Sequence, residues 1–166
     1  MISAALVEST WQDFGSADPK EARAVTKRAA KAQPALFEFV MVMTEEMSPA
    51  AHALALYMYH VVWEVFRRSC SRKLPRVKPG AIQRRWEENE RSIRRLEKAD
   101  PRFLERAAIE QTSIQPHVVA YVVQAMMDTP EDRVDLTPEE EGALLLIFKT
   151  IIDVLHDARE KAASAG

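Results

Sequence analysis

The amino-acid sequence predicts an all-α protein, a compact bundle of about seven to eight helices, and three observations carry this prediction. Apolar residues recur at helical spacing in long runs, whereas runs typical of strands are almost absent from the 166 residues. A proline stands at the start of six of the apolar runs. Proline is favoured in the first turn of a helix because the backbone N–H that it lacks would have no acceptor within the helix there. Two of these starts also show the spacing of a capping box, with Asp18 followed by Glu21 and Thr137 by Glu140.

The expected helices follow from these starts in chain order. A short amphipathic segment covers residues 2–14 and stops at Gly15. Three helices begin at prolines after it, and we expect them near residues 19–32, 34–46 and 49–72. The later helices are expected near residues 80–98, 101–114, 116–128 and 138–162. The run 118–123 is β-branched, but it continues at helical length and matches a helix of the first half, so we predict a helix there.

The order of the proline pairs indicates that the chain is built twice. Gln33-Pro34 recurs 82 residues later as Gln115-Pro116, and Ser48-Pro49 recurs 89 residues later as Thr137-Pro138, the extra residues falling in the acidic loop 128–135. We therefore expect a duplicated three-helix unit, at about 18–72 and 100–158, joined by a linking helix at about 80–98. The whole chain, 1–166, would then form a single domain. An open solenoid is the alternative, but no similarity appears at half the offset.

Counting residues excludes several classes of protein. One cysteine permits no disulfide framework, and four dispersed glycines form none of the common nucleotide-binding loops, so no cofactor is expected. The first residues lack the pattern of a signal peptide. The longest uncharged stretch, 47–63, is interrupted by a proline and two histidines, so we expect it to be a buried core helix and not a membrane span. We expect a cytoplasmic protein that makes no contact with a membrane.

The first candidate site is the stretch between Val65 and Trp86, which contains eight basic residues and no acidic one. Residues 128–166 hold ten acidic and four basic residues, so charge is sorted along a chain of net charge −2. Arginine pairs well with carboxylates and phosphates, and an aromatic ring beside it can stack on a base. Contact with an acidic partner or a phosphate is therefore assigned to Arg67, Arg68, Arg72, Lys73, Arg76, Lys78, Arg84, Arg85 and Trp86. The pI of about 6.1 favours a protein partner, or the acidic half of this chain, over nucleic acid.

The second candidate site lies on the two matching long helices. His60 and Glu64 share one helix face, as do Lys149 and Asp153 at the matching positions, and His156 follows Asp153 by three residues. If the halves face each other, His60, Glu64, Asp153 and His156 have the side chains needed for a metal site or for acid–base catalysis. The complete carboxylate–histidine pattern of a di-iron bundle is missing, however, and a solvated stripe with one ion pair per helix is the simpler interpretation.

A lone thiol is the third feature. Cys70 lies between two pairs of basic residues, and nearby positive charge favours a reactive thiolate. No base or oxyanion site can be identified beside it in the sequence, so we interpret Cys70 as incidental.

The leading hypothesis for function is a non-enzymatic protein–protein interaction module that associates with itself. The long helices at 53–66 and 143–155 are apolar nearly all round, and a second copy of the chain would supply cover for them. The basic segment 67–85 would steer an acidic partner. Two alternatives remain, a nucleic-acid-binding regulator that uses the same segment and an enzyme that uses the polar cluster of the long helices.

Overall fold

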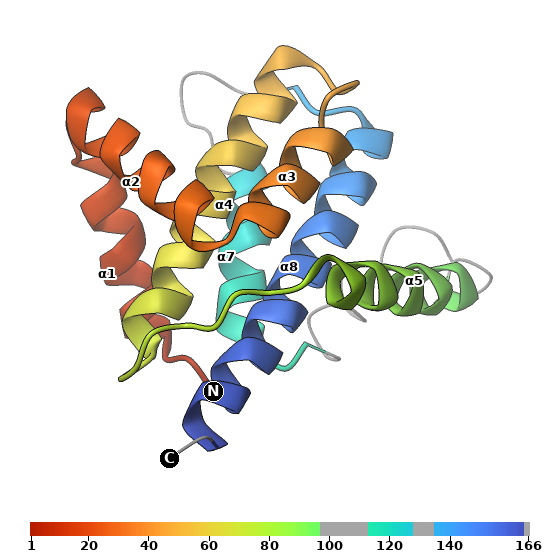
Figure 1. The fold of residues 1–166 in the computed structure, drawn as a ribbon. Helices are drawn as coiled ribbons and strands as arrows, with labels where there is room; N and C mark the ends of the chain where they lie inside the picture. Colours follow the sequence, from red (N-terminus) through yellow and green to blue (C-terminus); the bar gives the residue numbers. More distant parts are fainter. Residues whose placement is uncertain (97–112, 128–134, 165–166) are drawn as a thin grey trace.

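A computed structural model describes residues 1–96, 113–127 and 135–164 of the chain. These residues form seven α-helices and no strand, which confirms the predicted all-helical class (Figure 1). The helices are α1 (Ala4–Gly15), α2 (Pro19–Ala32), α3 (Pro34–Met43), α4 (Pro49–Ser69), α5 (Pro79–Leu96), α7 (Pro116–Met127) and α8 (Pro138–Ser164). The helix expected near 101–114 and most of the acidic loop lie outside the described residues.

The helix starts agree with the prediction from proline. Five of the six proline starts that the sequence predicted begin a helix, at α2, α3, α4, α7 and α8, and the sixth, Pro101, lies outside the described residues. The helix α5 also begins at a proline, Pro79, where the missing N–H costs no hydrogen bond. Both predicted capping boxes are present: Asp18 exchanges hydrogen bonds with Glu21 at α2, and Thr137 does so with Glu140 at α8.

Two helix ends come earlier than predicted. The helix α3 stops at Met43 rather than near residue 46, because the chain turns at Thr44, whose hydroxyl donates to the carbonyl of Val40 at 2.7 Å. The helix α4 stops at Ser69 rather than near residue 72, because Cys70 is already extended, with φ −95° and ψ 130°.

The two long helices, α4 and α8, form the centre of the molecule. They pack side by side, both running from the top of Figure 1 towards the bottom, and α3 and α7 pack against both of them. Every residue from Met58 to Phe66 of α4 is buried, and most of α8 from Leu144 to Leu155 is buried as well. The apolar surface that seemed to need a second copy of the chain is therefore largely covered inside one chain.

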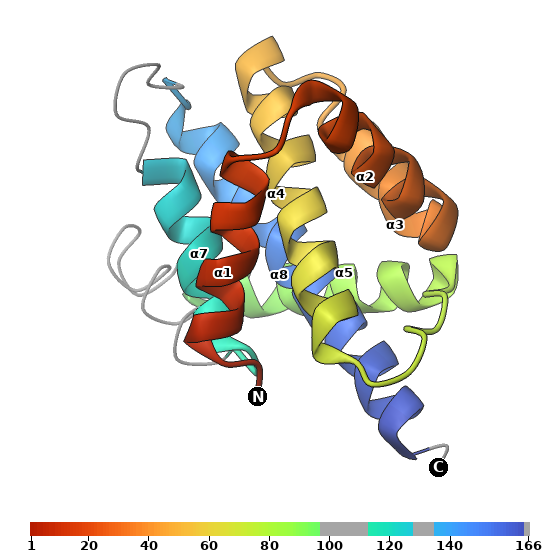
Figure 2. The ribbon, with the colours of Figure 1, turned by 90° about the vertical axis from the view of Figure 1, so that its left-hand side faces the viewer.

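Two further helices flank this centre on different sides. Figure 2 shows α1 beside α7, and α1 also packs on α4, whereas α5 packs on α8 and α3. An ion pair ties each flanking helix to a long one: Asp13 of α1 pairs with Arg68 of α4 at 2.5 Å, and Arg85 of α5 pairs with Asp157 of α8 at 2.7 Å.

Two buried glutamines connect the remaining parts of the chain. Gln33 precedes α3, and its side-chain Nε2 donates to the carbonyl of Pro75 at 2.8 Å while its Oε1 accepts from the N–H of Val77 at 2.9 Å. Gln115 precedes α7, and its Oε1 accepts from the N–H of Ile2 at 2.7 Å. Each glutamine thus holds the extended residues that lead into a flanking helix, α5 or α1, and satisfies a buried backbone N–H.

No helix in the described ranges is both long and apolar enough to span a bilayer.

Candidate functional site

A cleft of about 550 Å³ lies between the end of α2, the end of α4 and the segment that follows α4. Six of its twelve lining residues are basic and none is acidic. We call this site the basic cleft; it is lined by Arg28, Lys31, Ala32, Gln33, Trp63, Arg67, Cys70, Ser71, Arg72, Lys73, Leu74 and Arg76.

Local structure explains why these side chains converge. Arg28 and Lys31 are three residues apart on α2 and therefore share one helix face. Arg67 lies in the last turn of α4. The third wall is extended chain, which Gln33 holds in place through Pro75 and Val77, and the guanidinium of Arg76 donates to the carbonyl of Lys31 at 3.2 Å. One buried glutamine amide thus holds the third wall beside the end of α2.

One carboxylate at the edge of the site fixes an arginine. Glu64 is only 4% exposed, and it accepts two hydrogen bonds from Arg67, at 2.7 and 2.6 Å, and one from Arg68 at 2.9 Å. Burial alone would raise the pKa of Glu64, but the hydrogen bonds and charges of the two arginines outweigh it and lower that pKa. Glu64 therefore stays ionised, and it holds the half-exposed guanidinium of Arg67 in one orientation.

Three other cations of the basic cleft have no acidic side chain paired with them among the described residues. Within the described part of the chain, no ion pair or side-chain hydrogen bond involves Arg28, Lys31 or Lys73. All three side chains are exposed, so they are available to a ligand that brings negative charge.

The floor of the cleft is apolar. Trp63 and Leu74 are buried, and the thiol of Cys70 lies beside them in the lining. Burial raises the pKa of Cys70 more than the charge of Arg159 lowers it. The sequence suggested that flanking cations would favour a thiolate, but in the folded chain desolvation dominates.

The residues that the sequence singled out are divided among several places. Arg67, Arg72, Lys73 and Arg76 line the basic cleft. Arg68 and Arg85 instead pair with acids of other helices, as described above, and Trp86 packs edge-on against Phe39, with 5.7 Å between ring centroids. Lys78 and Arg84 are exposed and lie outside the lining of the cleft.

Sequence reasoning missed two of the cations, Arg28 and Lys31. The signal was present, because both basic residues fall on one face of a predicted helix that ends at Gln33-Pro34. The sequence does not show that the segment around Pro75, 42 residues after Gln33, returns to the end of this helix.

The polar residues of the long helices have separate partners. The carboxylate of Glu64 is bound by arginines of its own helix, whereas Asp153 Oδ2 accepts from Lys149 at 2.5 Å and from Asn89 of α5 at 3.1 Å. His156 Nδ1 is 3.0 Å from the amide Nε2 of Gln115. Among the described residues, no three potential metal ligands come close enough to hold an ion.

His60 is buried without a hydrogen-bond partner for its Nε2 in the described structure. Burial lowers the pKa of His60 to about 4, so the ring is neutral near pH 7. Its environment is that of a core histidine packed edge-on against Tyr59.

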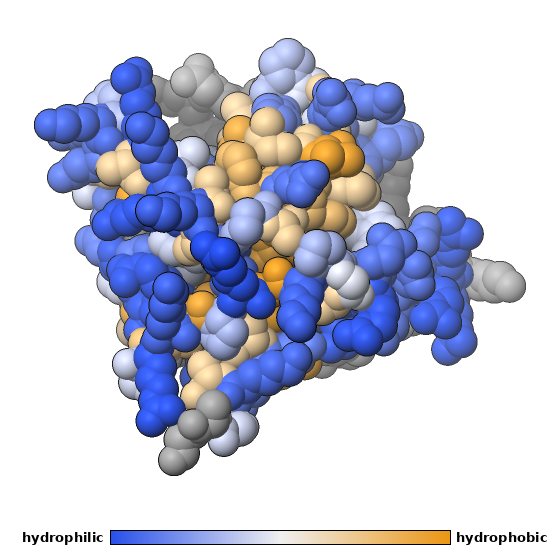
Figure 3. Space-filling view, in the orientation of Figure 1, coloured by the Kyte–Doolittle hydropathy of each residue, from blue (hydrophilic) through white to orange (hydrophobic). Residues whose placement is uncertain are grey.

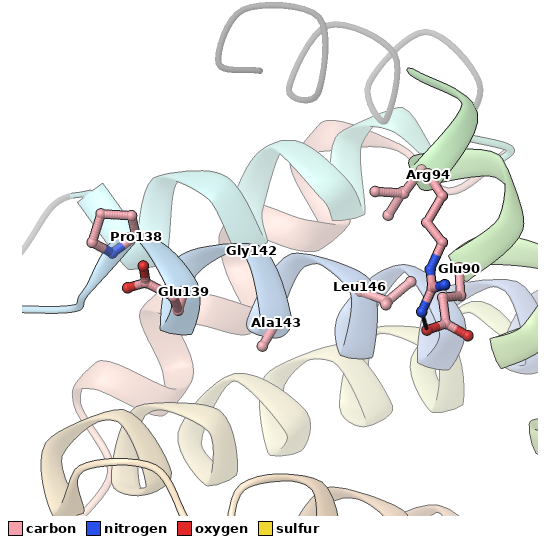
Figure 4. Close-up of a pocket in the computed structure, with 8 residues that line it drawn as sticks. Glu90, Arg94, Pro138, Glu139, Gly142, Ala143 and Leu146 are labelled. Carbon is pink, nitrogen blue, oxygen red and sulfur yellow. Dashed lines mark hydrogen bonds and ion pairs between the residues drawn. The ribbon is translucent and has the colours of Figure 1, made fainter. Parts of the chain in front are cut away.

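A second groove, of about 630 Å³, lies between α5 and the first turns of α8 (Figure 4). Its one basic side chain among the described lining residues, Arg94, is paired with Glu90 at 2.8 Å, and the floor is formed by small and apolar residues such as Ala143 and Leu146. This groove has neither the charge nor the converging donors of the basic cleft.

Comparisons with protein-family models, curated proteins and solved structures found no match to this chain.

Proposed function

We propose that this chain is a non-catalytic binding module and that the basic cleft recognises an acidic segment of a protein partner. The observation that supports this most directly is the lining, in which six cations and no acid surround a concave site. Such a site attracts carboxylates over distances of about a Debye length, roughly 8–10 Å, and rejects cationic partners.

The residues of the basic segment 67–85 do not form one continuous cationic surface, and this favours a compact ligand over a nucleic acid. A nucleic-acid backbone is best bound by a continuous track of cations. Arg68 and Arg85 are instead engaged by Asp13 and Asp157, and Trp86 is packed against α3. Arg67, Arg72, Lys73 and Arg76 lie together in the basic cleft, whereas Lys78 and Arg84 are exposed outside it.

We also propose that the chain contains two copies of one helical unit, and that α5 is the counterpart of α1 rather than a linker. Gln33 and Gln115 hold Val77 and Ile2 in the same way, each just before a flanking helix. Each flanking helix packs on one long helix and on the short helix that follows the glutamine holding it: α1 packs on α4 and α7, and α5 packs on α8 and α3. These parallels support a repeated unit that also includes the flanking helix.

Self-association remains part of the proposal, but it has a different candidate surface. In Figure 3 the main apolar area lies over α3 and the helices beside it. Met41 and Val42 at the end of α3 are 38% and 60% exposed, and they line a shallow groove of about 440 Å³ with Met47 and Pro49. Sedimentation of wild type and Val42→Asp tests this: a dimer that the substitution dissociates supports the surface, and a wild-type monomer removes it.

The binding proposal is tested by fluorescence anisotropy with a labelled oligoglutamate peptide. The cleft variant is Arg28→Gln/Lys31→Gln/Lys73→Gln; the matched control is Lys78→Gln/Arg84→Gln/Arg95→Gln, which removes the same charge from exposed positions outside the cleft. We expect the cleft variant to lose binding and the control to retain most of it. Equal loss in both variants would show that only net charge matters, and tighter binding of a single-stranded oligonucleotide would favour the regulator instead.

A further inference from the structure

We infer that the basic cleft is built for a phosphoryl group, so that the acidic segment it recognises is a phosphorylated one. This inference rests on the proposed function and narrows its ligand. It is carried by the number of donors, by the fixed arginine and by the size and floor of the cleft.

The density of donors exceeds what a carboxylate can use. A side-chain carboxylate carries one charge, so it neutralises only one of the cleft's cations even where, as at Glu64, it accepts hydrogen bonds from two arginines. A phosphoryl group carries about −1.5 to −2 charges near pH 7 and three acceptor oxygens, which can be approached from several sides. Three walls of the cleft each contribute cations, Arg28 and Lys31 from α2, Arg67 from α4 and Lys73 from the extended segment.

One of these donors is already oriented. The Nε and one terminal nitrogen of Arg67, a residue of the cleft lining, are held by Glu64, so the guanidinium plane is fixed before a ligand arrives. Less side-chain entropy is then lost on binding than with a flexible cation. Arg76 is also restrained, by its hydrogen bond to the carbonyl of Lys31.

The size and the floor of the cleft point to a side chain and its neighbours as the ligand. A volume of about 550 Å³ is in the range of sites that enclose a small group, roughly 300–1,000 Å³. Trp63 is 3% exposed and Leu74 is 8% exposed, so these two side chains give the cleft an apolar floor. A phosphorylated serine or threonine on an acidic segment fits this combination of a doubly charged group and a short apolar stem.

The test compares three labelled peptides that differ at one position, which is phosphoserine, glutamate or serine within the same acidic sequence. Wild-type protein is titrated against each by anisotropy, and inorganic phosphate, adenosine monophosphate and a single-stranded oligoribonucleotide are added as competitors. We expect the phosphoserine peptide to bind at least about tenfold more tightly than the glutamate peptide, because several charge-assisted hydrogen bonds replace one or two. The Arg28→Gln/Lys31→Gln/Lys73→Gln variant should lose this preference, and the Lys78→Gln/Arg84→Gln/Arg95→Gln control should keep it.

The outcomes separate this inference from the proposed function. Equal affinity for the phosphoserine and glutamate peptides, with loss in the cleft variant, would overturn the inference and leave the acidic partner. No binding of any peptide would overturn both. Tighter binding of the nucleotide or the oligoribonucleotide than of the phosphoserine peptide would show that the phosphoryl group belongs to another class of ligand, which also overturns the inference.

Discussion

The buried amide of Gln33 is the single group on which the shape of the basic cleft depends most, and Gln33→Met is the substitution that tests this. Methionine is unbranched and similar in length, so it fills the space but neither donates nor accepts the two hydrogen bonds. The N–H of Val77 then loses its partner in a buried position, and the carbonyl of Pro75 loses its partner at an exposed residue.

The expected loss of stability follows from the two bonds. A buried N–H left unpaired costs about 1–3 kcal/mol, and an exposed carbonyl that can bind water instead costs about 0.5–1.5 kcal/mol. We therefore expect Gln33→Met to lower the free energy of unfolding by roughly 2–4 kcal/mol. Urea denaturation followed by the fluorescence of the tryptophans, of which Trp63 is buried, measures this as a lower midpoint at an unchanged slope.

The matched control is Gln115→Met. It deprives the buried N–H of Ile2 of its acceptor and the ring of His156 of its donor, so the loss of stability should be of similar size. It should leave peptide binding unchanged, whereas Gln33→Met should weaken binding, because only Gln33 holds the segment that carries Lys73 and Arg76. A Gln33→Met protein within about 0.5 kcal/mol of wild type, or one that binds peptide as well as Gln115→Met does, would refute this reasoning.

Three further predictions concern buried and titrating groups. Glu64→Gln should lower stability by roughly 1–3 kcal/mol at pH 7, because charge-assisted hydrogen bonds to Arg67 and Arg68 are lost. Since the folded pKa of Glu64 is lowered, the difference from wild type should begin to shrink as pH falls below the unfolded-state pKa of about 4.3 and should be lost only as pH falls through the lower folded pKa. Wild-type stability should fall by roughly 2 kcal/mol between the unfolded-state pKa of about 6.5 and pH 4, because His60 takes up a proton only when unfolded, and His60→Met should lack this decline in urea titrations at stepped pH. Iodoacetamide should react slowly with Cys70 at pH 7 and more slowly still with the phosphoserine peptide bound, and an unchanged rate on adding peptide would place the ligand elsewhere.

The starts of the helices could be predicted from the sequence because their causes are local. A proline and a capping side chain act within one turn, so the starts of α2 and α8 need no knowledge of the rest of the chain. The ends of α3 and α4 were less predictable, because residues that helices accept, such as Glu45 and Arg72, follow Met43 and Ser69. The helices end where the chain turns at Thr44 and becomes extended at Cys70.

The site could be predicted only as far as it is contiguous in sequence. The basic segment marked Arg67, Arg72 and Lys73, but the contribution of α2 depends on a contact between residues about 40 positions apart, through Gln33. Arg68 carries the same charge as Arg67 and stands next to it, yet it faces Asp13 of α1. The rotation of the helix and partners distant in sequence decide which of the two arginines faces the cleft. Amino-acid composition gives no information about either.

Helix ends alone do not account for the charge at the basic cleft. Cations in a last turn stabilise a helix by about 0.3–1 kcal/mol each, which gives Lys31 and Arg67 a structural reason to be basic. The proposed second unit has the same glutamine and a long helix in the same place, yet His156 stands at the position that matches Arg67, and Ser113 at that of Lys31. The cations Lys31 and Arg67 are therefore not a feature that the matched positions of the two halves share. The anionic ligand that we propose for the basic cleft would account for this difference.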